Sequence, residues 1–159
     1  TTARLDEANS YASEHGLGGF VASSPQWSMA VPTASMEEFD PTTRFVVDSD
    51  RDWYRTHSVA VVPYTPTAGG FFSDTERDSA RSFHNETSLR RFEAVKQFAD
   101  KMGRSVSQTA LAYLLNQPFL VVPILGTANI EHLQTALGAD EIRLLEADLD
   151  LLRLPSSGA

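Results

Sequence analysis

The sequence contains no cysteine, which excludes disulfide bonds, thiolate zinc sites and cysteine nucleophiles. Its longest wholly apolar run covers only residues 119–125, whereas a membrane-spanning helix needs about 20 such residues. Basic residues are also few, with 13 Lys and Arg against 21 Asp and Glu and a formal net charge of −8. Because nucleic-acid phosphates are bound by clustered basic residues, this balance argues against a nucleic-acid partner. We therefore expect no nucleic-acid partner, no membrane, no metal site and a cytoplasmic location.

The rest of the composition is typical of a globular protein. Hydrophobic residues make up 42% and charged residues 21% of the 159 residues, which permits one domain with a sizeable core. We predict a single domain over residues 1–155 and a frayed tail at 156–159. The densest basic group, formed by Arg90, Arg91 and Lys96 on one predicted helix, is expected to be a solvated face. Because the sequence starts at Thr1 without methionine and is helical at once, we expect a processed start or a segment of a longer chain.

Three short β-rich runs are each followed by a helical pattern. The runs lie at Gly19–Ser24, Val59–Thr65 and Leu120–Leu125, and near-continuous apolar strands of this kind are typical of a parallel sheet covered on both faces. The predicted helices cover residues 3–14, 48–56, 89–102, 105–115, 129–137 and 144–152. This alternation predicts right-handed βαβ units and an α/β fold. Two long connections, Met29–Phe45 and Ala68–Thr87, are consistent either with binding loops or with mobile segments.

Four stretches, in this order and spacing, carry a resemblance that spans nearly the whole chain. They are Ala8–Ala12 leading into Phe20–Ser28 (ANSYA, FVASSPQWS), Pro63–Ser73 (PYTPTAGGFFS), Gln108–Pro118 (QTALAYLLNQP) and Pro123–Leu133 (PILGTANIEHL). In these stretches the chain resembles the aldo-keto reductases, which form an eight-stranded (β/α)₈ TIM barrel and transfer hydride between a nicotinamide cofactor and a carbonyl or alcohol. The resemblance implies a partial barrel, namely its C-terminal portion, with strands six to eight as three parallel strands and with five to six helices.

The same resemblance implies that the chain lacks the family's catalytic Asp, Tyr, Lys and His, which lie on the first four strands and their loops. The histidines of this chain are in other sequence contexts and do not replace them; they are His15, His57, His84 and His132. We therefore expect no catalytic residue in this chain. Whether the chain acts as an enzyme is left open by the sequence.

Ten residues are implied by the resemblance to contact NADP or NAD. They are Ser24, Tyr64, Thr65, Thr67, Gly69, Gly70, Gly126, Thr127, Asn129 and His132. Tyr64 would stack on the nicotinamide, and the small residues after it would let backbone amides approach the pyrophosphate. The helix that begins near Asn129 would present its N-terminus to the adenosine-side phosphate. The alternatives are a tyrosine packed between strand and helix, and a plain turn.

The sequence departs from the family pattern at several of these positions. Many members carry a cation at the positions of Gly126 and His132 to grip the 2′-phosphate, and Glu or Gln followed by Asn where this chain has Thr135 and Ala136. Ser24 stands where many members have a glutamine that contacts the carboxamide. These departures leave the choice between NADP and NAD open.

Two functions are consistent with these features. The chain is either an oxidoreductase module that supplies the cofactor side and needs an N-terminal half, or a non-catalytic truncated relative that acts as a nucleotide-binding or structural protein. Three adjacent barrel strands leave open edges and an uncovered apolar face. We therefore expect the chain to form a homo-oligomer, to pair with a complementary N-terminal half, or to rearrange so that its helices cover the sheet. A completed barrel would take a small-molecule carbonyl substrate.

Overall fold

The computed structural model describes residues 1–33 and 43–153, where helices alternate with short parallel strands as predicted. The predicted tail at 156–159 lies outside the described residues. The α-helices are α1 (Thr2–Glu14), α3 (Asp48–Thr56), α4 (Glu86–Met102), α5 (Val106–Leu115), α6 (Ile130–Leu137) and α7 (Glu146–Arg153). The strands are β1 (Ala22–Ser23) and β2 (Ala60–Val61), and the 3₁₀-helices are η1 (Ala68–Gly70), η2 (Asp78–Phe83) and η3 (Gly138–Glu141). No helix within these described ranges has the length and apolar content that crossing a bilayer requires.

The two strands are parallel, with Ala22 opposite Ala60 and Ser23 opposite Val61. The third predicted strand is only partly formed, because the segment after α5 joins β2 through a single parallel bridge between Val61 and Val121. Backbone hydrogen bonds still tie it to β2, since Val61 N donates to Leu120 O at 2.9 Å and Val122 N to Val61 O at 2.8 Å. The prediction of three full strands is therefore corrected to two short strands and one parallel segment beside them.

The two faces of this small sheet differ in how they are covered. Val59, Val61 and Val121 are buried on the side of the helices. Apolar residues that alternate with them are exposed instead, including Leu120 at 66% and Val122 at 49% of their accessible area. Among the described residues, the helices therefore cover one face of the sheet and leave the other open.

The core lies between α4, α5, α7 and the loop that follows β2. Phe71 and Phe72 meet edge to face with ring centroids 5.4 Å apart, and Phe71 meets Phe92 of α4 in the same way at 6.0 Å. Both Phe71 and Phe72 come from the long connection predicted at Ala68–Thr87, which the structure folds into η1 and η2 rather than leaving it irregular. This connection is thus part of the packed core.

The helix caps follow the sequence signals. Asn85 begins α4 by accepting a hydrogen bond from Ser88 N at 3.0 Å, and Gly103 ends it in the left-handed conformation with φ of 62°. Ser105 and Gln108, which stand in the sequence pattern S-x-x-Q, form a capping box at the start of α5. These local interactions fix where each helix begins and ends.

The predicted solvated helix face on α4 is wrong for one residue. Arg90 and Lys96 are exposed, but the half-buried Arg91 turns inward. Its guanidinium donates from Nη1 to Met29 O at 2.8 Å and from Nε to Arg153 O at 3.2 Å. Arg91 therefore ties α4 to the segment after β1 and to the end of α7.

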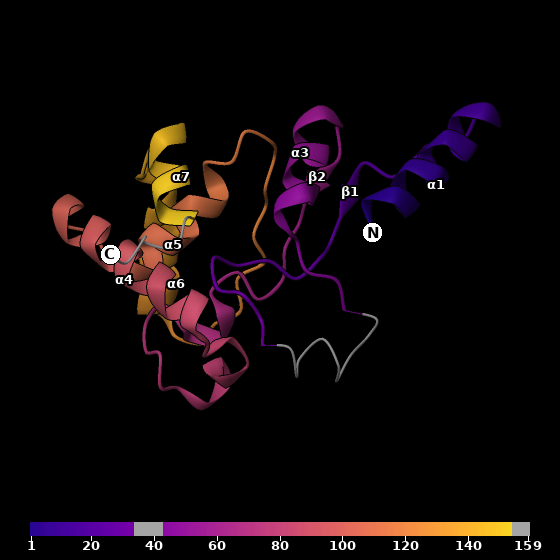
Figure 1. Ribbon diagram of the computed structural model, residues 1–159. Coiled ribbons are helices and arrows are strands. Elements are labelled where there is room, and N and C mark those ends of the chain that lie inside the picture. Colours follow the sequence, from indigo (N-terminus) through magenta and orange to yellow (C-terminus); the bar gives the residue numbers. More distant parts are fainter. Residues whose placement is uncertain (34–42, 154–159) are drawn as a thin grey trace.

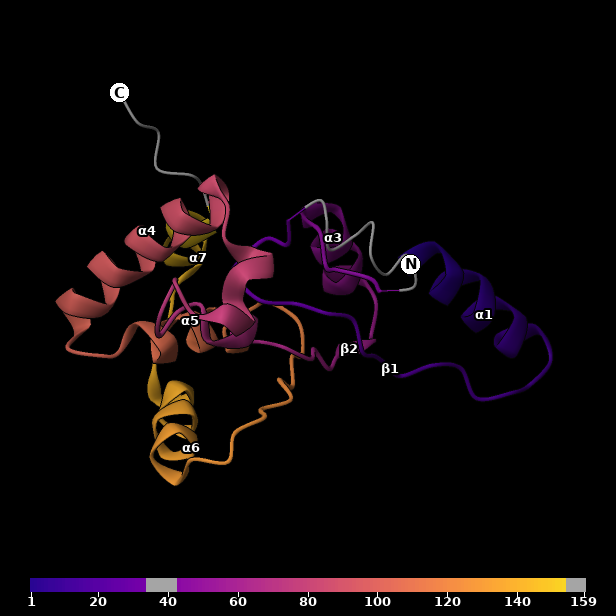
Figure 2. The same ribbon diagram turned by 90° about the horizontal axis from the view of Figure 1, so that it is seen from below.

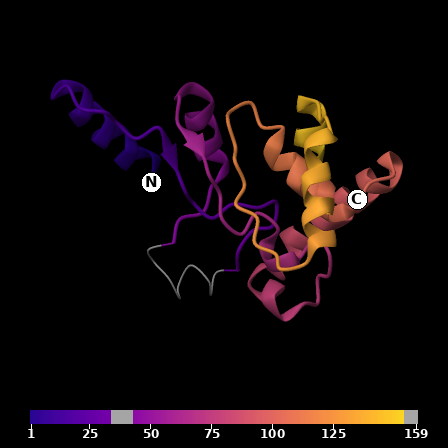
Figure 3. The same cartoon turned by 180° about the vertical axis from the view of Figure 1, so that it is seen from behind.

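Helix α1 lies apart from the helical core in all three views (Figures 1–3). Of its residues only Ala12 is buried, and Tyr11 is 58% exposed. Its attachment to α3 is polar, since Trp53 Nε1 donates to Asp6 Oδ2 at 2.8 Å and His57 Nε2 lies 3.4 Å from Asp6 Oδ1. Helix α1 is therefore held by a few polar contacts rather than by a shared core.

Candidate functional site

The loop after β2 begins with Tyr64 and has an unusual backbone. Thr65 and Ala68 adopt positive φ angles of 54° and 53°, although neither is glycine, and left-handed backbone of this kind at non-glycine residues is concentrated at functional sites. Gly69 follows with φ of 65°, and a Cβ there would lie 2.1 Å from the carbonyl oxygen of Ser79. Only glycine fits this position, because both the backbone angle and the close approach exclude a side chain.

This loop forms one wall of an open pocket of about 800 Å³. The other walls are the start of α5, the end of the third parallel segment and one side of α6. The described residues that line the pocket are Tyr64, Thr65, Pro66, Thr67, Gly69, Gly70, Phe72, Ser73, Arg77, Ser105, Val106, Ser107, Ile124, Leu125, Gly126, Thr127, His132, Thr135 and Ala136. No carboxylate occurs among these lining residues, so the pocket suits an anionic or neutral ligand.

Eight of the ten residues predicted to contact a cofactor lie together in this pocket. They are Tyr64, Thr65, Thr67, Gly69, Gly70, Gly126, Thr127 and His132. Tyr64 is half-buried. The structure thus joins the loop after β2 to the start of α6, which are separated by about sixty residues in the sequence.

The other two predicted residues do not line the pocket. Ser24 Oγ donates to Val62 O at 2.8 Å, which ties the end of β1 to the end of β2. Asn129 caps α6, and its Oδ1 accepts from Glu131 N at 2.8 Å and from His132 N at 3.3 Å. These two amides are therefore already satisfied, and the N-terminus of α6 is less open to a phosphate than the sequence suggested.

The structure adds Arg77, which the sequence analysis did not single out. A Cβ on Gly70 would lie 2.7 Å from Arg77 Nη1, so the guanidinium packs directly over the backbone of Gly70. Arg77 makes no side-chain hydrogen bond or ion pair within residues 1–33 and 43–153, in contrast to Arg81, which pairs with Asp78 at 2.9 Å. It is the one Arg or Lys that lines the described part of the pocket. A basic residue shortly after the Gly-Gly turn was the only signal in the sequence.

The start of α5 was also missed as part of the site. Ser105, Val106 and Ser107 line the pocket opposite the glycine turn. Ser105 Oγ accepts from Gln108 N at 3.1 Å, and Gln108 Oε1 in turn accepts from Ser105 N at 3.2 Å. The capping box was recognised in the sequence, but which pocket it faces depends on how α5 packs.

Comparison with known proteins gives consistent matches over nearly the whole chain. The family model described as "Aldo/keto reductase family" matches residues 2–153. Norsolorinic acid reductase B of Dothistroma septosporum is 28% identical over 157 residues, a match that covers 92% of this chain and 36% of that protein. The uncharacterized oxidoreductase YrpG of Bacillus subtilis is 27% identical over 157 residues, covering 94% of this chain and 44% of that protein. A probable aldo-keto reductase 1 of Glycine max is 29% identical over 130 residues, covering 74% of this chain and 38% of that protein.

A solved structure gives the same result for the fold. A thermostable aldo-keto reductase in complex with the inhibitor epalrestat superposes with a TM-score of 0.62 and 23% sequence identity, covering 94% of this chain and 43% of that one. The chain is thus similar to a partial barrel, and it spans less than half the length of the relatives and of the solved structure that it matches.

Proposed function

Because this chain belongs to the aldo/keto reductase family, we propose that it supplies the nicotinamide-nucleotide side of an oxidoreductase whose proton donor lies on a separate N-terminal half. The observation that carries the proposal is the gathering of eight predicted contact residues in one pocket without carboxylates. The proposed reaction is hydride transfer between the cofactor and a carbonyl or alcohol, and the bound cofactor would supply or accept the hydride.

The residues of the pocket fit a dinucleotide. Tyr64 offers an aromatic ring at the end of β2, and its role would be to orient the nicotinamide rather than to move a proton. The compact turn through Gly69 and Gly70 lets the backbone approach a diphosphate, and Arg77 adds a positive charge beside it. His132 lies at the α6 wall, in the position where many family members carry an arginine that binds the 2′-phosphate. We therefore expect NADH to bind at least as well as NADPH at neutral pH.

Catalysis needs a proton donor in addition to the cofactor. Reduction of a carbonyl requires a proton as well as a hydride. Tyr64 and His132 line the described pocket, and both are assigned here to cofactor contacts rather than to proton transfer. The missing half of the barrel would supply the proton donor and cover the open face of the sheet.

Cofactor binding is tested by titrating the purified chain with NADH and with NADPH, followed by native mass spectrometry. We expect one cofactor per chain, and Arg77→Gln should weaken binding about tenfold because it removes a charge-assisted contact to phosphate. Arg81→Gln is the matched control, since Arg81 is exposed, pairs with Asp78 and does not line the pocket. No cofactor mass, or equal affinities in both variants, would favour the alternative of a non-catalytic structural relative.

The missing half is tested by mixing the chain with a polypeptide that carries the N-terminal part of the Bacillus subtilis relative. Neither part alone should oxidise NADH or NADPH in the presence of a small aldehyde, and the mixture should do so. Val122→Asp on the open sheet face should abolish this activity. Leu151→Asp should not, because Leu151 is an exposed apolar residue on α7, away from that face. Failure of the wild-type mixture alongside intact cofactor binding would leave a nucleotide-binding protein without catalysis.

A further inference from the structure

A second cavity, of about 220 Å³, lies on the other side of the segment after β1. Its described walls come from residues 26–32, the start of α3 and side chains of η2, α4 and α5. The apolar part of the lining includes Trp27, Phe45, Val46 and Phe83, and the polar part includes Gln26, Arg51, Arg91 and Tyr113. None of these residues is shared with the proposed cofactor pocket.

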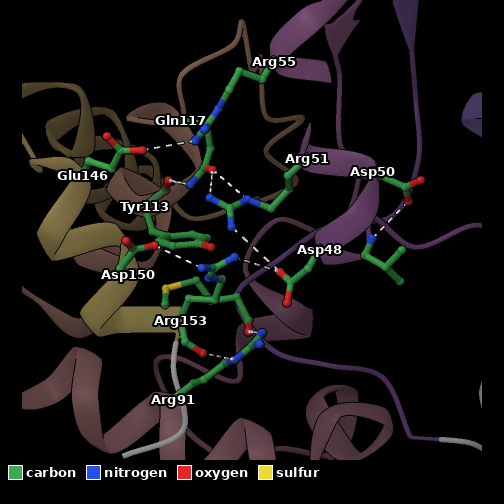
Figure 4. A network of polar contacts seen from close by, with 12 residues as sticks. Asp48, Asp50, Arg51, Arg55, Arg91, Tyr113, Gln117, Glu146, Asp150 and Arg153 are labelled. Carbon is green, nitrogen blue, oxygen red and sulfur yellow. Dashed lines mark hydrogen bonds and ion pairs between the residues drawn. The ribbon is translucent and has the colours of Figure 1, made fainter. Parts of the chain in front are cut away.

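Positive charge dominates this cavity. Figure 4 shows the guanidiniums of Arg51, Arg91 and Arg153 gathered around Tyr113, with Asp48 facing Arg51 and Arg153. Asp48 Oδ1 lies 3.8 Å from Arg51 Nη1 and 3.6 Å from Arg153 Nη1, and these distances are longer than a charge-assisted hydrogen bond. Arg91 makes no ion pair at all with residues 1–33 and 43–153. Arg153 also pairs with Asp150, whose Oδ1 lies 3.1 Å from Arg153 Nη2. Within the described residues, Arg91 is therefore the member of this cluster without a carboxylate partner.

The hydrogen bonds of Arg51 and Arg91 are to neutral oxygens. Arg51 donates from Nε and Nη2 to Gln117 Oε1 at 3.1 and 2.8 Å, and Arg91 donates only to the carbonyls of Met29 and Arg153. The buried Nε of Arg153 has no hydrogen-bond partner among the described residues. Since each guanidinium carries five N–H donors, donors of this cluster are left over.

Two polar side chains in the cavity are buried and unpartnered. Gln26 and Tyr113 are only 3% and 4% exposed. Neither the Gln26 amide nor the Tyr113 hydroxyl makes a hydrogen bond within the described residues, yet both residues line the cavity. Their side-chain amide and hydroxyl groups can therefore bond a ligand in the cavity, and the neighbouring guanidiniums of Arg51 and Arg91 favour a ligand that accepts hydrogen bonds.

Burial also shifts the pKa values of two side chains that line the cavity. It lowers the pKa of the Arg91 guanidinium and raises the pKa of the Tyr113 hydroxyl, although the neighbouring Arg51 and Arg91 act to lower the latter. A neutral Tyr113 hydroxyl can donate a hydrogen bond to an anion. Partly buried cations without a counter-charge are costly, and a bound anion would offset that cost.

We infer that this cavity binds a small organic carboxylate, with the carboxylate against Arg51, Arg91, Tyr113 and Gln26 and the apolar body against Trp27, Phe45 and Phe83. The planar guanidiniums match the geometry of a carboxylate. The aromatic and aliphatic wall favours a ligand with an apolar body over a bare anion. The site is separate from the proposed cofactor pocket, although the bridge between Gln26 and Tyr64 places both at the carboxyl end of the sheet.

The inference is tested by calorimetric titration of the purified chain with benzoate and with benzamide, its neutral analogue of the same shape. Benzoate should bind at least tenfold more tightly than benzamide. Gln26→Leu and Tyr113→Phe should each weaken benzoate binding about tenfold. Neither should lower the unfolding midpoint of the unliganded chain, because each removes a polar group that has no partner in the protein.

Three results would overturn the inference. The first is equal binding of benzoate and benzamide, and the second is unchanged benzoate affinity in both variants. The third uses a chain in which Glu37, Glu38 and Asp40 are replaced by Gln, Gln and Asn. If that chain binds benzoate and the wild-type chain does not, the cavity takes a carboxylate of the chain itself rather than a separate ligand.

Discussion

The two faces of the small parallel sheet have the same kind of side chains and opposite surroundings. On the helix side Val61 is fully buried, whereas on the other side Leu120 and Val122 are among the most exposed apolar residues of the chain. Apolar side chains alone therefore do not make a core, because burial needs a second layer. The face with helices belongs to the packed core of the described residues, and the other face is exposed.

The largest expected effect comes from truncating the covered core. Phe71→Ala should lower the free energy of unfolding by about 3–5 kcal/mol, because it removes a fully buried ring that packs against Phe72 and Phe92. Val122→Ala on the open face should change it by less than about 0.5 kcal/mol. Urea denaturation followed by circular dichroism measures both. Similar losses in the two variants would mean that the open face is covered in solution.

Alanine substitutions at two glycines compare the turn in the pocket, at Gly69, with a position that has space for a side chain, at Gly126. Gly69→Ala should cost about 1–3 kcal/mol and should abolish cofactor binding, because the backbone is left-handed and the methyl group would meet Ser79 O. Gly126→Ala should be tolerated, since a Cβ added there would meet no atom within 4 Å. Thermal unfolding and nucleotide titration check the pair. Tolerance of alanine at Gly69 would show that the turn is not rigid.

Removing an N-cap side chain should have different effects on a helix that packs in the core and on one that does not. Asn85→Ala should lower global stability by about 1 kcal/mol, because Asn85 caps α4, which contributes to the core. Asn129→Ala should only increase amide exchange within α6, since α6 buries none of its residues. Hydrogen exchange read by mass spectrometry distinguishes local from global opening. A loss of global stability in Asn129→Ala would mean that α6 is more tightly coupled to the core than its exposure indicates.

The smallest effect concerns pH. Burial raises the pKa of the Tyr54 and Tyr113 hydroxyls above their ordinary value of 10.0. As the pH rises through 10, the unfolded chain loses these protons first, so the free energy of unfolding falls above pH 10 and is unaffected by these groups below it. Urea midpoints at about pH 8 and about pH 11 measure the decline. Tyr113→Phe should make this decline in stability shallower. An equally steep decline in the variant would mean that other groups cause it.

Much of the fold could be predicted from local sequence. The end of α4 and the start of α5 follow from Gly103 and the Ser105–Gln108 capping box, because caps act within one turn of backbone. The start of α4 was predicted at residue 89, whereas Asn85 caps the helix at Glu86. The order of the parallel segments followed from the alternation of apolar runs and helices. The length of the third strand could not be predicted, since a strand extends only as far as neighbouring backbone bonds to it, and this segment meets β2 at a single bridge.

Most residues of the candidate site could be predicted from the sequence, but Arg77 and the burial of individual arginines could not. The resemblance to the aldo-keto reductases indicated Tyr64 and the glycine turn, and the structure places them in one pocket with Gly126, Thr127 and His132. Arg77 was missed because nothing local distinguishes it from Arg81, which pairs with Asp78 on the surface. Arg91 was predicted to be solvated, since helical spacing alone does not show that α7 ends against it.

The sequence by itself determined the helix boundaries, the parallel order of the apolar segments and the family to which they belong, because these depend on backbone preferences, apolar periodicity and short motifs. Only the tertiary structure decided which arginine is buried, which face of the sheet is covered and which loops share a pocket. Those features depend on contacts between residues that are far apart in the chain, and the spacing along one segment does not specify such contacts.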